Sequence, residues 1–112
     1  MSFERYAVVR VPFPFTDRAA TRNRPALILS DAAGFNVPAG HSVLAMITSA
    51  DNPSWPHDHL IADLAAAGLP APSRLRFKLF TLDNRLIRST LGRLAPADTR
   101  AVRAALKRVF DV

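Results

Sequence analysis

Residues 11–30 read VPFPFTDRAATRNRPALILS, and this stretch sets the framework of the fold. An apolar run interrupted by two prolines, Pro12 among them, leads into a polar segment with three arginines, and Pro25 then opens a second apolar run. Proline cannot donate to a sheet ladder, so it belongs at a sheet edge or a bend. A short run that is apolar throughout is typical of a strand buried on both faces. The stretch predicts a β-hairpin of residues 6–15 and 26–29, with residues 16–24 as a cationic loop at its tip.

The rest of the chain alternates short β-like segments with turns rich in Gly and Pro, and ends in one helical pattern. Five or six short strands with a single terminal helix predict an α+β fold that is mainly β, a small half-open barrel covered on one side. The length predicts a single domain over residues 1–112. The further expected elements are a loop at 30–40, a strand at 41–49, a loop at 51–56, a short strand at 57–62, one helical turn at 63–68, a strand at 73–81, a turn or short helix at 83–88, a strand at 91–95 and a helix from residue 96.

The composition indicates a packed, basic protein. Fifteen Lys and Arg residues against nine Asp and Glu give a formal charge of +6, and only Lys78 and Lys107 are lysines. An arginine-rich surface favours phosphate-bearing partners, with nucleic acid first among them. The chain has no cysteine, which excludes disulfides, a thiolate nucleophile and a cysteine zinc site. No apolar span reaches membrane length and no signal peptide is evident, so we expect a cytoplasmic protein without membrane contact.

Three residues in the later part of the chain are candidates for RNA contact. Arg74 and Arg76 lie two apart in a predicted strand, so both side chains, with Lys78, are expected on one face, where they could follow an RNA backbone. The alternative is a solvated basic face that protects an edge strand from aggregation. Trp55 could stack on a base, or it could pack on the barrel or at a dimer contact.

The three histidines raise the alternative of a zinc site. His57 and His59 are spaced to share one strand face, and His41 could complete a triad. Two histidines at this spacing more often mark a polar strand face, and no metalloprotease motif accompanies them. We therefore expect no metal.

Several segments in the same order resemble the MazF/PemK family of toxin endoribonucleases: VVRVPFPFTD at 8–17, RPALILS at 24–30, AMITS at 45–49, Trp55 and Asp58, AAAGLP at 65–70, KLFTLD at 78–83 and LGRL at 91–94. Co-linear motifs along nearly the whole chain are more specific than any single one. The resemblance implies an SH3-like barrel of the CcdB/PemK type, usually a homodimer, which cleaves single-stranded RNA without a metal or cofactor and is inhibited by an antitoxin from the same operon.

The resemblance also implies roles for individual residues. Arg24 stands where the family has its active-site arginine, and its guanidinium suits stabilisation of the transition-state charge, with protonation of the leaving oxygen as a second possibility. Thr48 matches the family threonine, whose hydroxyl could donate to a phosphate oxygen or orient the attacking group. Thr16, Arg18 and Arg22 are expected to bind RNA within a lid at residues 16–23 that could also respond to the antitoxin.

One departure from the family pattern leaves the general base open. Some relatives have an aspartate shortly after the arginine that corresponds to Arg76, whereas here Phe77 and Lys78 follow. Asp17 is then the remaining, weak candidate for the base.

Two functions therefore stand side by side. The first is a toxin endoribonuclease, which Arg24 and Thr48 favour. The second is a catalytically weak or inactive relative that binds nucleic acid or antitoxin, or poisons gyrase as CcdB does, and the missing acid at residues 77–78 favours this one.

The C-terminal helix is expected to be structural, covering the barrel with its apolar stripe. The stripe consists of Val102, Ala105, Leu106, Val109 and Phe110.

Overall fold

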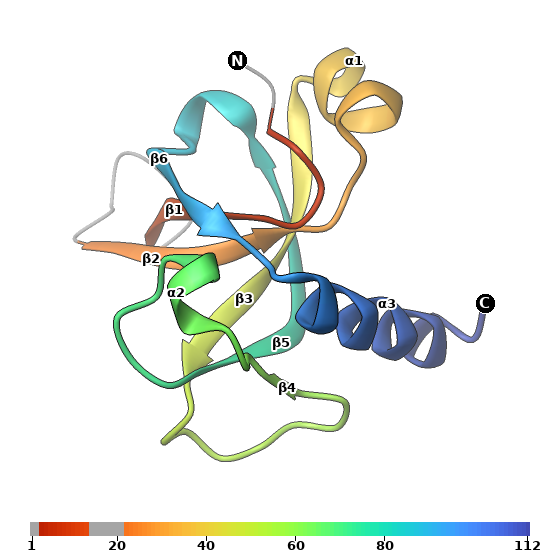
Figure 1. Ribbon diagram of the computed structural model, residues 1–112. Coiled ribbons are helices and arrows are strands. Elements are labelled where there is room, and N and C mark those ends of the chain that lie inside the picture. Colours follow the sequence, from red (N-terminus) through yellow and green to blue (C-terminus); the bar gives the residue numbers. More distant parts are fainter. Residues whose placement is uncertain (1–2, 14–21) are drawn as a thin grey trace.

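The computed structural model describes residues 3–13 and 22–112, which form one antiparallel six-stranded sheet in the order β4-β5-β3-β2-β1-β6 (Figure 1). The predicted half-open barrel with a C-terminal helix is confirmed. The strands are β1 (Ala7–Phe13), β2 (Arg22–Ile28), β3 (His41–Ser49), β4 (His59–Leu60), β5 (Ser73–Asp83) and β6 (Ser89–Arg93). The helical segments are η1 (Ala32–Asn36, a π-helical turn), α1 (Val37–Ala39), α2 (Leu64–Ala67), η2 (Asn84–Leu86, a 3₁₀ turn) and α3 (Pro96–Phe110).

Prolines mark where neighbouring strands stop pairing. β1 pairs with β6 only from Ala7 to Arg10, so Pro12 lies past the β6 ladder while still paired with β2. Pro25 likewise lies one residue before Ala26, where the β2–β3 ladder begins. Both prolines thus stand where a ladder no longer needs an N–H donor, as the sequence predicts.

The second strand begins earlier than expected. β2 starts at Arg22, so residues 22–24 belong to the strand and not to the loop tip. The remainder of the predicted tip falls within residues 14–21, which lie outside the described residues. At residues 22–24, β2 pairs with β1 but has no ladder to β3. This end of the strand can therefore carry polar side chains that point to solvent.

Two apolar clusters cover opposite faces of the sheet. The first contains Val8 and Leu27, and the second contains Val9 and Ile28, so consecutive residues of one strand alternate between the clusters. Side chains alternate across a strand, and a central strand buried on both faces therefore needs an unbroken apolar run. Residues 26–29 are all buried, which confirms that expectation.

The short helix α2 packs against β6 through two glycines. A Cβ on Gly68 would lie 2.1 Å from the Leu91 carbonyl oxygen, and one on Gly92 would lie 2.4 Å from the Ala66 oxygen. Gly68 also has φ +72°, the left-handed conformation that ends a helix. The predicted helical turn is confirmed, and both glycines permit an approach that no other residue allows.

Helix α3 begins at Pro96 as predicted and covers the first cluster with Val102, Ala105 and the partly buried Leu106. The expectation that the whole stripe covers the barrel is wrong at its end, because Val109 and Phe110 are exposed. The last turn extends beyond the barrel (Figure 1).

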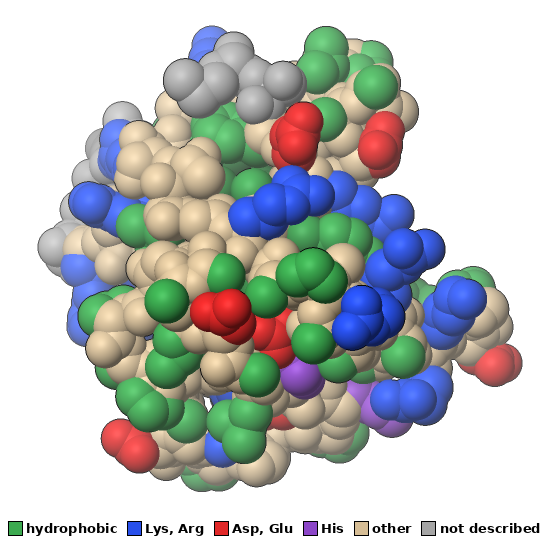
Figure 2. Space-filling view, viewed as in Figure 1, with side chains coloured by type: hydrophobic (Ala, Val, Ile, Leu, Met, Phe, Trp, Pro, Cys, Tyr) green, Lys and Arg blue, Asp and Glu red, His purple; other side chains and the backbone are tan. Residues whose placement is uncertain are grey.

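Lys and Arg side chains gather over and beside α3 (Figure 2). Those of α3 itself are Arg100, Arg103, Lys107 and Arg108. No described helix is long and apolar enough to cross a membrane.

Other boundaries also differ from the sequence prediction, among them that of the strand predicted at 73–81, which extends to Asp83. The expected loop at 30–40 contains η1 and α1, because the Asp31 carboxylate accepts a hydrogen bond from the Gly34 N–H at 2.7 Å and Gly40 ends the turn at φ +66°. The strand at 57–62 is shortened to β4, since His57 has φ +64° and interrupts extended backbone. The last strand starts at Ser89 and ends at Arg93, two residues earlier than expected.

Candidate functional site

The sheet brings three predicted site residues into one row across β2, β3 and β5. Ala26 of β2 lies opposite Met46 of β3 at the start of the β2–β3 ladder. Side chains alternate along a strand, so Arg24 and Thr48, each two residues beyond this pair, point to the same face as the pair. Thr48 in turn lies opposite Arg74 of β5. Directly opposite residues of antiparallel strands point to the same face, so the three side chains share one surface.

Arg24 of β2 lies at the end of this row that is next to β1. Its guanidinium carbon is 4.4 Å from the ring centroid of Phe13, a cation–π contact that orients the side chain. Its buried Nε has no hydrogen-bond acceptor among the residues that the structure describes. A buried donor without an acceptor is costly to leave unpaired, and a phosphate oxygen is an acceptor that could satisfy it. Arg22, two residues earlier, is exposed at the start of β2.

Thr48 occupies the middle of the row. Its Oγ1 accepts a hydrogen bond from Asn52 Nδ2 at 2.6 Å. A threonine hydroxyl has one donor and two acceptor positions, so this bond fixes the oxygen and leaves the O–H to donate. The Thr48 O–H therefore remains able to donate to a further acceptor.

Arg74 and Arg76 lie on one face, as predicted, because both contact the carboxylate of Asp58. Most of their donors are nevertheless engaged within the protein, although the buried Nε of Arg74 has no acceptor among the described residues. Arg74 donates to Ser54 Oγ at 2.7 Å and to the Ala50 carbonyl at 2.8 Å, while Arg76 donates to the Pro53 carbonyl and to Asp58. Lys78 is exposed at a register shift in the β3–β5 ladder, where Phe77 and Lys78 have no partner on β3.

Asp58 is the acidic centre of this surface, and the sequence reasoning assigned it no role. Its side chain is only 4% exposed and lies 2.9 Å from an Arg76 nitrogen. Burial alone would raise the pKa of Asp58, but hydrogen bonds from Arg76 and the Trp55 N–H, together with the charges of Arg76 and Arg74, hold it below its usual value. Asp58 belongs to the family-like motifs, but the local pattern gives it no role because its arginine partners lie 16 and 18 residues away on β5.

Trp55 lies over Arg76, with the guanidinium carbon 4.7 Å from the ring centroid. The residue remains 44% exposed. It therefore packs on a charged side chain and not into the barrel core, so one part of the indole stays available at the surface.

The histidines do not form the alternative zinc triad. His41 lies opposite Asp83 on β5 and His59 lies opposite Leu75, eight residues along the same strand, a separation of about 26 Å. His59 Nε2 instead contacts Asp98 Oδ1 at 2.7 Å. Across residues 3–13 and 22–112, no three His, Cys, Asp or Glu side chains group closely enough to hold a metal ion.

Asp98 is a buried carboxylate at the start of α3, 1% exposed. It accepts hydrogen bonds from the backbone N–H groups of Ala62 and Asp63 at 2.9 and 3.0 Å, in addition to the contact with His59. Burial acts to raise the pKa of Asp98, but these bonds outweigh it and lower the pKa. Asp98 thus ties α3 to the β4–α2 connection and has a structural role.

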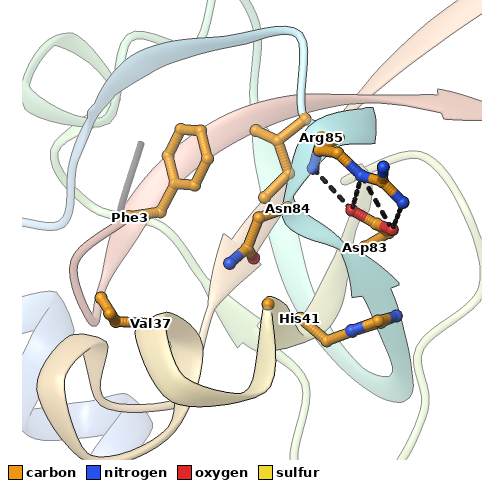
Figure 3. Close-up of a pocket in the computed structure, with 8 residues that line it drawn as sticks. Phe3, Val37, His41, Asp83, Asn84 and Arg85 are labelled. Atoms are coloured by element: carbon orange, nitrogen blue, oxygen red, sulfur yellow. Dashed lines mark hydrogen bonds and ion pairs between the residues drawn. The ribbon is translucent and has the colours of Figure 1, made fainter.

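A surface hollow of about 900 Å³ lies at the other end of β3 and β5, between Phe3, Val37 and the η2 turn (Figure 3). The Asp83 carboxylate is paired with Arg85 at 2.8 Å, and hydrogen bonds from Arg85 lower the pKa of Asp83. The Asn84 side chain accepts from Ser42 Oγ and donates to the Asn36 carbonyl. The side chains of Asp83, Asn84 and Arg85 in this hollow thus already have partners within the protein, and the row on β2, β3 and β5 is the stronger candidate site.

Of the predicted site residues, the structure groups Arg24, Thr48 and Arg74 in the row and Arg76 and Trp55 beside it. Thr16, Asp17 and Arg18 lie outside the described residues.

Comparison with known proteins gives the class of the chain. A family model described as PemK-like, MazF-like toxin of type II toxin-antitoxin system matches residues 4–110. These are small toxins that act in pairs with an antitoxin. The chain belongs to this family, whose MazF-type toxins are endoribonucleases. The alternative of a CcdB-like gyrase poison is not favoured by this match.

Solved structures agree with the fold. A MazE–MazF crystal structure from Deinococcus radiodurans has a TM-score of 0.78 and 23% identity, covering 100% of this chain and 99% of that one. A Mycobacterial endoribonuclease in complex with its cognate antitoxin has a TM-score of 0.74 and 20% identity, covering 99% and 95%. The Mycobacterium tuberculosis toxin MazF-mt6 has a TM-score of 0.72 and 19% identity, covering 95% and 97%. No curated protein matches the chain by sequence.

Proposed function

We propose that this chain is an active endoribonuclease that cleaves single-stranded RNA without a metal, through attack of the 2′-hydroxyl on the adjacent phosphate. The observation that carries the proposal is that Arg24 and Thr48 lie on the same face of the neighbouring strands β2 and β3. An oriented hydroxyl and a guanidinium with an unpaired buried donor can both address the oxygens of one phosphate.

The reaction requires three proton and charge movements. A base takes the 2′-hydroxyl proton, O2′ bonds to phosphorus, and the bond from phosphorus to the 5′-oxygen breaks as that oxygen gains a proton. The products are a 2′,3′-cyclic phosphate and a free 5′-hydroxyl. Arg24 stabilises the extra negative charge on the phosphate oxygens, and Thr48 donates a hydrogen bond to one of them. Arg24 is also our candidate for protonating the leaving oxygen.

The described residues include no strong candidate for the general base. Phe77 packs against the first cluster and Lys78 is a cation, so neither can replace the acid that some relatives carry. Asp58 is held between two arginines with a lowered pKa, which makes it a weak base. Asp17 remains the proposed base, and Thr16, Arg18 and the exposed Arg22 remain proposed RNA contacts.

The proposal includes an antitoxin as the inhibiting partner, a homodimer as the active assembly and the cytoplasm as the compartment. The family description supports the first, because it names a toxin-antitoxin system. A formal charge of +6 also suits an acidic partner as well as RNA.

Incubation of the purified protein with single-stranded RNA in excess chelator tests the proposal. The ribose strand should be cut, and a copy with 2′-deoxy substitution at the cut position should stay intact. Arg24→Ala should abolish cutting with an unchanged circular dichroism spectrum, while Arg93→Ala, which removes an exposed arginine on β6, should cut normally. Failure to cut a varied set of RNAs, or full activity of Arg24→Ala, would refute the assignment.

A further inference from the structure

The loop between β3 and β4, residues 50–58, is fastened to β5 by two arginines. Arg74 reaches the Ala50 carbonyl and Ser54 Oγ, and Arg76 reaches the Pro53 carbonyl. Both arginine side chains are largely buried, 14% and 11% exposed. Guanidinium groups that already hold a loop are poorly placed to exchange their partners for phosphates, so their contribution to RNA binding is indirect.

Asp58 closes this arrangement. Its carboxylate accepts from Arg76 at 2.9 and 3.4 Å and from the Trp55 N–H at 2.9 Å, and it lies 3.9 Å from an Arg74 nitrogen. The Asp58 N–H returns a bond to the Trp55 carbonyl at 3.2 Å. One carboxylate therefore fixes both the arginine beneath the indole and the backbone of the indole's own residue.

The loop also touches the candidate catalytic row. Asn52 donates to Thr48 Oγ1 from the same loop that carries Trp55. Arg76 lies over one face of the Trp55 ring and 44% of the residue is exposed, so part of the ring remains at the surface on the loop whose Asn52 contacts Thr48. An indole backed by a cation is a strong platform for stacking a nucleobase.

We propose that Asp58 is a positioning residue that holds Arg76 and Trp55 as a stacking platform for an unpaired RNA base next to the cleaved phosphate. Stacking strength grows with the area of the base, so the platform favours a purine over a pyrimidine at that position. The inference rests on the proposed function, because it assumes that the cleaved phosphate lies at Arg24 and Thr48.

Binding can be tested separately from cleavage because Trp55 is the chain's only tryptophan. A short single-stranded RNA with 2′-O-methyl groups throughout cannot be cut by 2′-hydroxyl attack, and it should quench the Trp55 fluorescence on binding. Asp58→Asn should weaken that quenching and move the emission to longer wavelength. Asp51→Asn removes the same charge from an exposed position of the same loop and should behave as wild type.

Cleavage gives the second readout. RNAs that differ only in the flanking base, as purine, pyrimidine or abasic ribose, should differ in KM for the wild type. Trp55→Ala should remove that preference and raise KM for the purine RNA roughly 5- to 150-fold, the range expected for one stacked base, while kcat changes little. Asp58→Asn should act in the same direction, and Asp58→Glu should restore part of the preference.

Three results would overturn the inference: an unquenched wild type with RNA bound, an unchanged flanking-base preference in Trp55→Ala, or an unchanged preference in a folded Asp58→Asn. Should Asp58→Asn fail to fold, Arg76→Gln applies the same test while Arg74 still accompanies the carboxylate. Quenching without any cleavage by wild type would refute the proposed function but support the platform. If Arg24→Ala abolishes cleavage but RNA does not quench the wild-type fluorescence, the proposed function is supported and the platform is refuted.

Discussion

Replacing Asp98 tests a buried carboxylate that joins α3 to the connection between β4 and α2. Asp98→Ala removes three hydrogen bonds to a carboxylate that is 1% exposed, one of them part of the contact with His59. Leaving the N–H groups of Ala62 and Asp63 without their acceptor costs about 1–3 kcal/mol each, so we expect a loss of roughly 3–5 kcal/mol. For 112 residues the entropy of unfolding is about 0.24 kcal/mol/K, so the melting temperature should fall by about 12–20 °C. Asp98→Asn keeps the shape and one acceptor, and should cost about half as much.

The pH dependence of this effect has a defined sign. The pKa of Asp98 is lowered in the folded chain, so its contribution is present above the unfolded pKa of about 3.9 and is lost as pH falls through the lower folded pKa. The gap in unfolding free energy between wild type and Asp98→Asn should therefore narrow below about pH 4.

Urea denaturation at pH 7 and pH 3, at one fixed protein concentration, measures both quantities, with Asp51→Asn as the exposed control. A cost below about 1 kcal/mol for Asp98→Ala at pH 7 would show that the contact with His59 and the two N–H groups does not hold α3 in place. An equal gap at pH 3 and pH 7 would show that the folded pKa is not lowered.

Three further substitutions follow from the packing and the proposed site. Gly68→Ala should lower the melting temperature strongly, because the new Cβ would meet the Leu91 oxygen at 2.1 Å, whereas Gly40→Ala, at a similar φ with open space, should cost only about 1–2 kcal/mol. Leu27→Ala should cost about 2–5 kcal/mol in urea denaturation, and Leu60→Ala, at an exposed position, less than about 1 kcal/mol. Arg24→Lys keeps the charge but loses the two-pronged guanidinium, so single-turnover RNA cleavage should slow about 100-fold or more; a rate near wild type would show that charge alone suffices.

Local patterns predicted the elements whose signal is short in range. The Pro25-led apolar run, the capped turn of α2 and the start of α3 at Pro96 each depend on residues within a few positions of one another. The turn at 30–40 was harder, because the Asp, Gly and Pro residues that signal a loop also cap a helical turn.

The residues of the candidate site could be predicted from the sequence, but their arrangement could not. Arg24 and Thr48 were predicted from family motifs, but their position on the same face of the sheet depends on the β2–β3 register, which the pairing of distant strands decides. The partners of Arg74 and Arg76 were not predicted, because the strand alternation gives the face of a side chain but not what lies on that face.

The sequence by itself thus determined a basic, mainly β chain with a C-terminal helix and a family-like set of polar residues. Only the tertiary structure decided that Asp58 lies between Arg74 and Arg76, that Trp55 rests on a guanidinium and that Asp98 joins α3 to the loop after β4. The physical reason is range: periodicity, capping and turn preferences act over a few residues, whereas these contacts join residues 16 to 36 positions apart that meet only once the strands have paired.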